Sequence, residues 1–160
     1  MKDAAAKEVG RLIASQCLAV RVRRLERVIS RIYDAALADH GINIAQLNLL
    51  AAIAVGGRAR PSDVTRLLDL EKSTLSRNLK RMESLGWVHS DPNVPRRGRF
   101  LRLTPAGSRI LIKMRAVWEE AQATALVELG QRSFTQPRKL LSTLAPSAKT
   151  RGAHDGKRAS

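Results

Sequence analysis

An uninterrupted helical repeat of apolar residues between positions 11 and 38 constrains this chain more than any other feature of its sequence. Its members step by four and three residues with no Gly or Pro between them: Leu18, Val22, Leu25, Ile29, Ile32 and Ala36. This spacing predicts one long helix with a coiled-coil-like apolar seam. At about 1.5 Å per residue the helix would be roughly 42 Å long, which is too long for one small domain to cover. We therefore expect a second copy of the chain to cover the seam, so that the protein is a homodimer.

The composition favours helices and a polyanionic partner. Hydrophobic residues make up 44% of the 160 residues but aromatic residues only 3%, so the core must consist of aliphatic side chains. Such a core suits packed helices better than a β-sandwich. The formal net charge of +15 favours nucleic acid as the partner, with an anionic membrane surface as the alternative.

The sequence lacks the signals of an enzyme, a metal protein or a membrane protein. No apolar run approaches the roughly 20 residues that span a bilayer, and the first residues lack a leader pattern, so we expect a cytoplasmic protein without a membrane partner. Cys17 is the only cysteine, and no Cys and His residues have zinc-site spacing. The histidines His40, His89 and His154 are scattered, and neither a phosphate-binding loop nor a nucleophile motif is present. We expect no catalytic residues, metal or cofactor.

Three shorter helices are predicted after Gly41, which ends the first. Asn43 and Gln46 have the spacing of a capping box. The inner face of the helix that they start is expected to consist of Leu47, Leu50, Ala51 and Ala54, and Gly56-Gly57 should end it. Pro61 suits the first turn of a short helix that ends near Asp69. The last helix, 72–85, has Leu75, Leu79, Met82 and Leu85 on one face and stops at Gly86. Two short helices joined by a tight turn predict a helix-turn-helix.

The pattern then changes to a hairpin and a closing helix. Trp87 and Val88 should enter a strand, a Pro- and Arg-rich loop covers 91–98, and Leu101 and Leu103 alternate with Arg102. Thr104-Pro105 predicts a helix start, followed by one face with Ile110, Met114, Val117 and Ala121. A break at Gly130, a last helix near 138–144 and a flexible basic tail over 146–160 complete the prediction. The fold class is therefore mainly α with a small β-hairpin wing.

Two basic groups are candidates for contacts with duplex DNA. The helix 72–85 carries cations and hydroxyls off its apolar face, suited to phosphates and base edges: Lys72, Ser73, Thr74, Ser76, Arg77, Asn78, Lys80 and Arg81. The hairpin adds arginines suited to a narrow minor groove: Arg96, Arg97, Arg99 and Arg102. A solvated helix face and a solubilising loop are the alternative interpretations.

Other basic residues are assigned to structure. The first helix carries Arg21, Arg23, Arg24, Arg27 and Arg31, which surround the seam and can pair with acids such as Glu26 across a dimer interface. Single-stranded RNA binding is disfavoured because the chain has few aromatic residues on which bases could stack.

The segments LEKSTLSRNLKRMESLGWV (70–88) and RLTPAG (102–107) resemble the MarR family, the multiple antibiotic resistance regulators. The resemblance implies one domain over 11–145: dimerisation helices 11–38 and 105–145, and a DNA-binding lobe, 43–104, whose helix 72–85 enters the major groove while the wing reaches the minor groove. It also implies a ligand-responsive repressor that acts as a homodimer on a palindromic operator in double-stranded DNA. The alternatives are an architectural protein with little sequence specificity and a general RNA-binding accessory protein.

The same resemblance implies a pocket for a small aromatic or phenolic effector between the dimerisation helices and the DNA-binding lobe. Arg27, Tyr33 and His40 are its candidate polar residues, with ordinary surface or interface roles as the alternative. Cys17 resembles in position a reactive cysteine of the family's hydroperoxide-sensing branch, but its distance from Tyr33 differs, and we predict a structural role. The chain departs from the family in Pro95-Arg96-Arg97, where the wing usually has Asp-x-Arg. It departs also in Asp69, at a turn position where Gly is common and where Asp can adopt the left-handed conformation.

Overall fold

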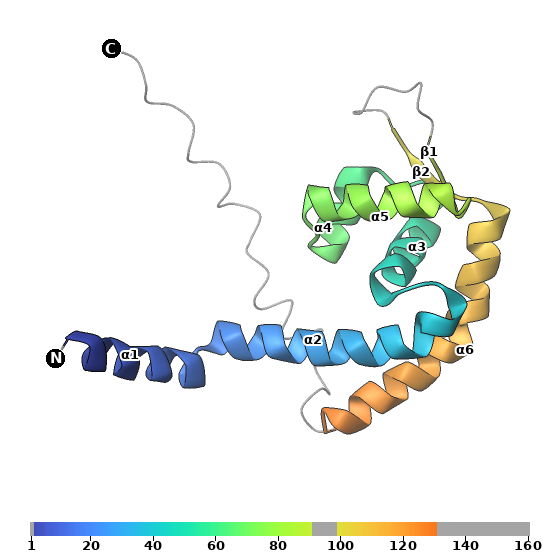
Figure 1. Cartoon of the computed structure of the whole chain (residues 1–160). Helices are drawn as coiled ribbons and strands as arrows, with labels where there is room; N and C mark the ends of the chain where they lie inside the picture. Colours follow the sequence, from blue (N-terminus) through green and yellow to red (C-terminus); the bar gives the residue numbers. More distant parts are fainter. Residues whose placement is uncertain (1, 91–98, 131–160) are drawn as a thin grey trace, which may run out of the picture. The chain divides into compact units, whose positions relative to one another are not determined.

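The computed structural model describes residues 2–90 and 99–130 (Figure 1). The elements follow in the order α1 (Lys2–Gln16), α2 (Leu18–Leu37), η1 (Ala38–His40), α3 (Ile44–Gly56), α4 (Pro61–Leu68), α5 (Lys72–Ser84), β1 (Val88–Ser90), β2 (Leu101–Leu103) and α6 (Pro105–Glu128). The chain divides into two units, Met1–Ala125 and Leu126–Ser160, and the packing described below lies within the first. The predicted helix 138–144, the tail 146–160 and the wing residues Pro95, Arg96 and Arg97 lie outside the described residues.

The single helix predicted over 11–38 is wrong. The structure has α1 and α2 in its place, and Cys17 between them has an extended backbone (φ −63°, ψ 114°). Ser15 and Cys17 are weak helix formers. The residues before and after Cys17 are exposed, so packing does not hold the chain in a helix here. The guanidinium of Arg21 donates to the carbonyl of Ser15 at 2.7 Å, which satisfies an acceptor freed by the break. No Gly or Pro marks the position, so the sequence gives no signal of the break.

The seam itself is covered over only part of its length. Leu18 is 72% exposed and Val22 54%, whereas Ile29, Ile32 and Ala36 pack against the core of their own chain. The end of the helical stretch follows the prediction, because Gly41 has a positive φ of 66° and donates its N–H to the carbonyl of Ala38. The apolar surface left uncovered is thus that of the first half of α2, not of the whole seam.

Helix α3 lies at the centre of the core. It contacts α2, α4, α5 and β2, so side chains are buried on several of its faces. Leu49, Leu50 and Ile53 are fully buried, whereas Ala54, predicted to face inwards, is exposed. The predicted inner face is therefore only partly right: a helix surrounded by neighbours does not follow a single apolar stripe.

The ends of the helices follow the predicted signals. Asn43 accepts a hydrogen bond from the N–H of Gln46 at 2.9 Å, and Gln46 accepts one from the N–H of Asn43 at 3.2 Å, which completes the capping box. Helix α4 begins at Pro61 and is followed by Asp69 in the left-handed region (φ 49°, ψ 44°). Asp tolerates this conformation, and the tight turn that results leads directly into α5. The helix-turn-helix prediction is confirmed.

The hairpin joins α5 to α6. Strands β1 and β2 are antiparallel, with Val88 opposite Leu103 and Ser90 opposite Leu101. Ala59, in the loop before α4, adds a bridge to Leu101. The hydroxyl of Thr104 accepts the N–H of Gly107 at 3.0 Å, which caps α6 as predicted. A Cβ at Gly107 would overlap the backbone carbonyl of Trp87, so glycine allows the start of α6 to approach the hairpin.

Candidate nucleic-acid interface

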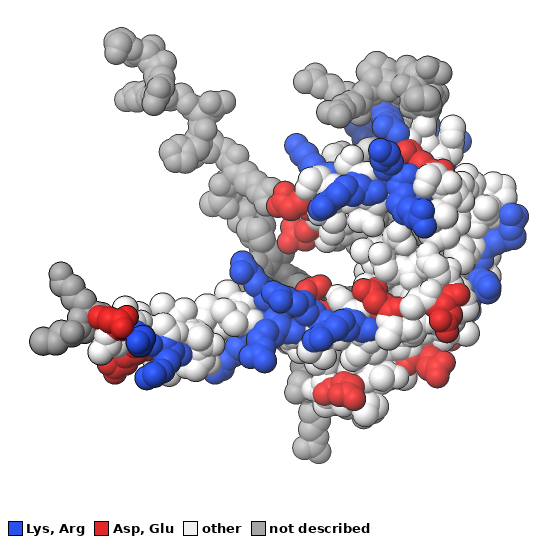
Figure 2. Space-filling view, viewed as in Figure 1, with Lys and Arg blue, Asp and Glu red and all other residues white. Residues whose placement is uncertain are grey.

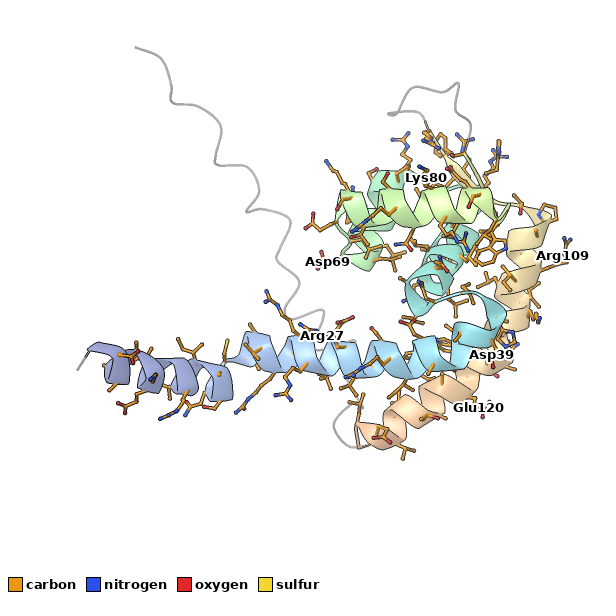
Figure 3. All side chains as sticks on the ribbon, in the orientation of Figure 1. Arg27, Asp39, Asp69, Lys80, Arg109 and Glu120 are labelled. Atoms are coloured by element: carbon orange, nitrogen blue, oxygen red, sulfur yellow. The ribbon has the colours of Figure 1, made fainter. Side chains whose placement is uncertain are left out.

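Helix α5 is anchored by one face and exposes the other. Leu75, Leu79 and Met82 are buried and fix its rotation about the helix axis. Of the predicted DNA-binding residues, the opposite side exposes Lys72, Ser73, Ser76, Arg77 and Lys80, and Thr74 is half-buried. Figure 3 labels Lys80 on this helix. Cations and hydroxyls thus project from one side of a rigidly held helix.

The cations of α5 have no acidic partners among the residues described. The ion pairs in this part of the chain are Lys7–Asp3, Arg66–Asp63, Arg99–Glu83 and Arg115–Glu119. Figure 2 shows Lys and Arg side chains gathered over α4 and α5 and again along α2. Uncompensated positive charge on an exposed face favours a polyanion.

A cavity of about 400 Å³ lies between α4 and α5 on the same side. It brings Lys72, Ser76 and Lys80 together with Arg99, which is far from them in sequence. From α4, the hydroxyl of Ser62 lines the cavity together with that of Thr65, which donates to the carbonyl of Ser62 at 2.9 Å. Glu83 lines the cavity as well, so the cavity's positive charge comes from Lys72 and Lys80, which stand beside neutral hydroxyls in a mixture suited to a nucleic-acid backbone.

Arg99 has a different setting from the other predicted cations. One terminal nitrogen (Nη2) donates to the carboxylate of Glu83 at 2.9 Å and contacts the hydroxyl of Ser90. Ser90 also donates to the same carboxylate. Glu83 belongs to α5, whereas Ser90 and Arg99 border the two ends of segment 91–98. This cluster ties both ends of the hairpin loop to α5 and neutralises Arg99.

Two further arginines near the hairpin were missed by the sequence interpretation. The guanidinium carbon of Arg58 lies 3.7 Å from the centre of the Phe100 ring, and that of Arg60 lies 5.3 Å from it. Both side chains are exposed. The available signal was the pair of arginines directly before Pro61, which the prediction used only as a helix start.

A second cavity, of about 460 Å³, lies between α2, α3 and the α6 segment around Trp118. Tyr33 lines it and donates its hydroxyl to the side-chain oxygen of Gln122. Burial raises the pKa of the Tyr33 phenol above its ordinary value. Arg27 and His40 do not line this cavity. Sequence reasoning named Tyr33 but missed Trp118 and Gln122, since their pattern on α6 reads as ordinary helix surface.

The described part of the chain has neither a group of three His, Cys, Asp or Glu side chains placed to hold a metal ion nor a helix long and apolar enough to cross a membrane.

Fold and surface together define a winged helix-turn-helix protein. A family model described as "MarR family" matches residues 40–97. The chain is 30% identical over 81 residues to the multiple antibiotic resistance protein MarR of Salmonella typhimurium. That alignment covers 50% of this chain and 56% of the relative, so the chain spans little more than half the length of the curated protein it matches.

Solved structures of regulators share the fold. A cysteine-to-serine mutant of E. coli MarR, complexed with operator DNA, has a TM-score of 0.71 and 23% identity, and the match covers 84% of this chain and 99% of that one. The transcriptional regulator MosR of M. tuberculosis has a TM-score of 0.68 and 27% identity, covering 82% and 94%. BpsR of Bordetella bronchiseptica, whose DNA binding 6-hydroxynicotinic acid regulates, has a TM-score of 0.62 and 18% identity, covering 81% and 90%. Residues 40–97 of the chain match the MarR family model, in agreement with the resemblance found in its sequence.

Proposed function

We propose that this protein is a sequence-specific transcriptional regulator that binds duplex DNA as a homodimer. The observation that carries the proposal is the exposed face of α5, where Lys72, Arg77 and Lys80 have no acidic partners among the described residues and stand beside hydroxyls. Helix α5 is held in a helix-turn-helix and carries both cations and hydroxyls. Such a helix is suited to entering the major groove. The MarR family match and the operator-bound E. coli MarR of the same fold support this function.

In this proposal the residues divide by role. Ser73, Ser76 and Arg77 read base edges, while Lys72, Thr74 and Lys80 contact phosphates, since lysine acts as a point charge and arginine can bond a guanine with two donors. Arg96 and Arg97 of the wing contact the minor groove. Arg99 acts through Glu83 and holds the wing in place.

The dimer is proposed from the apolar surface that one chain leaves exposed. Val9, Leu12 and Ile13 of α1 are more than half exposed, and Leu18 and Val22 of α2 continue this surface. Exposed apolar side chains gathered along successive helices mark an interaction surface. Two copies related by a two-fold axis would present two α5 helices to two half-sites, which accounts for a palindromic operator.

Effector binding is proposed for the cavity that Tyr33 lines. Trp118 offers an aromatic wall, and Asn48 and the hydroxyl of Tyr33 offer polar groups, a set suited to a small aromatic or phenolic molecule. BpsR, with the same fold, responds to an aromatic acid of this size class. A molecule held between α2, α3 and α6 would shift the central helices relative to α5 only if it bound one arrangement more tightly than the other. If the effector binds less tightly to the arrangement that binds DNA, it releases the protein from DNA. The protein would then act as a repressor that the effector inactivates.

Selection of duplexes from a random pool tests the proposed function. A regulator should enrich a palindrome and bind it about a thousandfold or more tightly than unrelated DNA at the same salt concentration. An architectural protein would bind both alike, because it recognises charge and shape. A general RNA-binding protein would prefer RNA in a competition assay, and either outcome would contradict the proposal.

A further inference from the structure

The outer face of the hairpin carries a second cationic surface. Ala59 and Leu101 pair through two backbone hydrogen bonds of 3.0 and 2.8 Å, and both side chains are buried. Because neighbours along a strand point to opposite sides, the residues next to them point outwards. These outward residues are Arg58 and Arg60 in the loop before α4, and Phe100 and Arg102 at β2. We call them the outer wing face.

This surface concentrates positive charge on an aromatic platform. The guanidinium groups of Arg58 and Arg60 share the Phe100 ring, at 3.7 and 5.3 Å from its centre. Stacking on a ring restricts long side chains that would otherwise sample many rotamers. Two like charges over one ring also repel each other, and this repulsion is relieved by an anion that both can contact.

Within residues 2–90 and 99–130, no carboxylate forms an ion pair with the outer wing face. On the inner side of the same hairpin, by contrast, Arg99 pairs with Glu83 at 2.9 Å. The neighbour of Arg102 across the strands is His89, which adds no negative charge. The outer charges are therefore available to a partner, whereas the inner one is neutralised.

We infer that the outer wing face binds the phosphate backbone of duplex DNA that flanks the operator half-site held by α5. This inference rests on the proposed function. Strand alternation directs Arg58, Arg60 and Arg102 away from the side on which Arg99 meets α5, so the phosphates that they reach lie beyond those under α5. Phosphate fits these groups because guanidinium donors match its oxygens in geometry and charge. Such contacts lengthen the footprint on DNA and carry no base information.

Duplexes of two lengths test this inference. The short duplex is the sequence selected by the wild-type protein, and the long one extends it by about ten base pairs, one helical turn, on each side. Arg58→Gln/Arg60→Gln should bind the long duplex roughly 5- to 50-fold more weakly at ~0.1 M salt and lower the slope of log K against log salt by about two to four, because the proposed dimer loses four cations. Binding to the short duplex should change less than about twofold, because its phosphates end under α5.

Matched variants separate charge from structure. Arg58→Lys/Arg60→Lys keeps the charges and should keep the salt slope on the long duplex. Arg11→Gln/Arg115→Gln removes the same net charge from α1 and α6 and should leave the difference between the two duplexes unchanged. The urea midpoint of unfolding should be the same for the Arg58→Gln/Arg60→Gln variant as for the wild type, since both side chains are exposed.

The outcomes distinguish this inference from the proposed function. If the wild type selects no sequence, the proposed function fails. A second outcome is that the wild type binds its selected duplex while Arg58→Gln/Arg60→Gln gains as much affinity from the longer duplex as the wild type does. In that case the proposed contact with flanking DNA is wrong and the proposed function stands. An equal loss on both lengths also overturns it, because the arginines would then act inside the half-site.

Discussion

The central lobe, 44–103, and the helices α1 and α2 both carry aliphatic residues at helical spacing. They differ in how far the same chain buries these residues. In the lobe, Leu49, Leu50 and Ile53 are fully buried by elements of the same chain. In the N-terminal helices, Leu12 is 54% exposed and Leu18 72%. Apolar periodicity specifies that a face will be buried but not what will bury it. The lobe therefore buries its apolar face within one chain, whereas α1 and the first half of α2 leave theirs exposed, and in the proposed dimer a second copy covers it.

The largest effect should come from a charge on the half of α2 that lacks cover. Leu25→Glu would place a carboxylate in the proposed dimer interface without a partner, at a cost of several kcal/mol of association free energy. Sedimentation should show a dimer for the wild type and a monomer for the variant. Val55→Glu is the matched control: Val55 is 89% exposed but lies in the lobe, so its dimer should persist. A folded wild-type monomer at micromolar concentration would overturn the comparison.

Glycine-to-alanine substitutions compare the packing of the two regions directly. A methyl group at Gly107 would meet the carbonyl of Trp87, whereas at Gly10 it would meet nothing within 4 Å. Gly107→Ala should destabilise the fold by about 1–3 kcal/mol, because the start of α6 must move away from the hairpin. Gly10→Ala should stabilise α1 by up to about 1 kcal/mol, because alanine favours helix. Urea unfolding measures both, and changes of equal sign would contradict the contrast.

Sequence reasoning was most successful where structure depends on local chemistry. The capping box of Asn43, the start at Pro61 and the left-handed Asp69 are each decided by a residue and its near neighbours, and all were predicted. The break at Cys17 was not, because no single residue there forbids a helix. The packing around α3 was predicted only in part, since burial on several faces is set by its neighbours in space.

The candidate site divides in the same way. The exposed face of α5 followed from helical periodicity, so the side of the helix that carries Arg77 could be predicted from sequence. The engagement of Arg99 by Glu83 depends on how the hairpin returns towards α5, and the stacking of Arg58 on Phe100 joins residues that are far apart in the chain. Neither pairing has a signal in a single sequence.

Removal of one arginine from each region tests whether charge alone explains DNA binding. Arg77→Ala should weaken binding to the selected operator by about 1–3 kcal/mol and relax its sequence preference, because a base contact is lost. Arg24→Ala removes a charge that is also exposed, from α2, and should change operator affinity by much less. Fluorescence anisotropy with operator and unrelated duplexes measures both losses. Equal losses on the two duplexes for Arg77→Ala would remove this residue from base reading.

The smallest effect is expected at Cys17, where the two N-terminal helices join. Cys17 is half-buried and precedes α2 as its N-cap residue, with an extended backbone and no hydrogen bond from its side chain. Serine is a favoured N-cap because its hydroxyl accepts a backbone N–H two or three residues onwards, here that of Ala19 or Val20. Cys17→Ser should therefore raise the free energy of unfolding by up to about 1 kcal/mol and leave operator binding and any effector response unchanged.

Peroxide treatment separates this structural role of Cys17 from a sensing role. On the structural interpretation, wild-type protein and Cys17→Ser respond to peroxide alike in an operator-binding assay, because packing at the junction does not require a thiolate. If peroxide instead releases the wild-type protein and Cys17→Ser abolishes that release, Cys17 is a thiol sensor. The N-terminal helices would then transmit a signal to the lobe in addition to joining two copies.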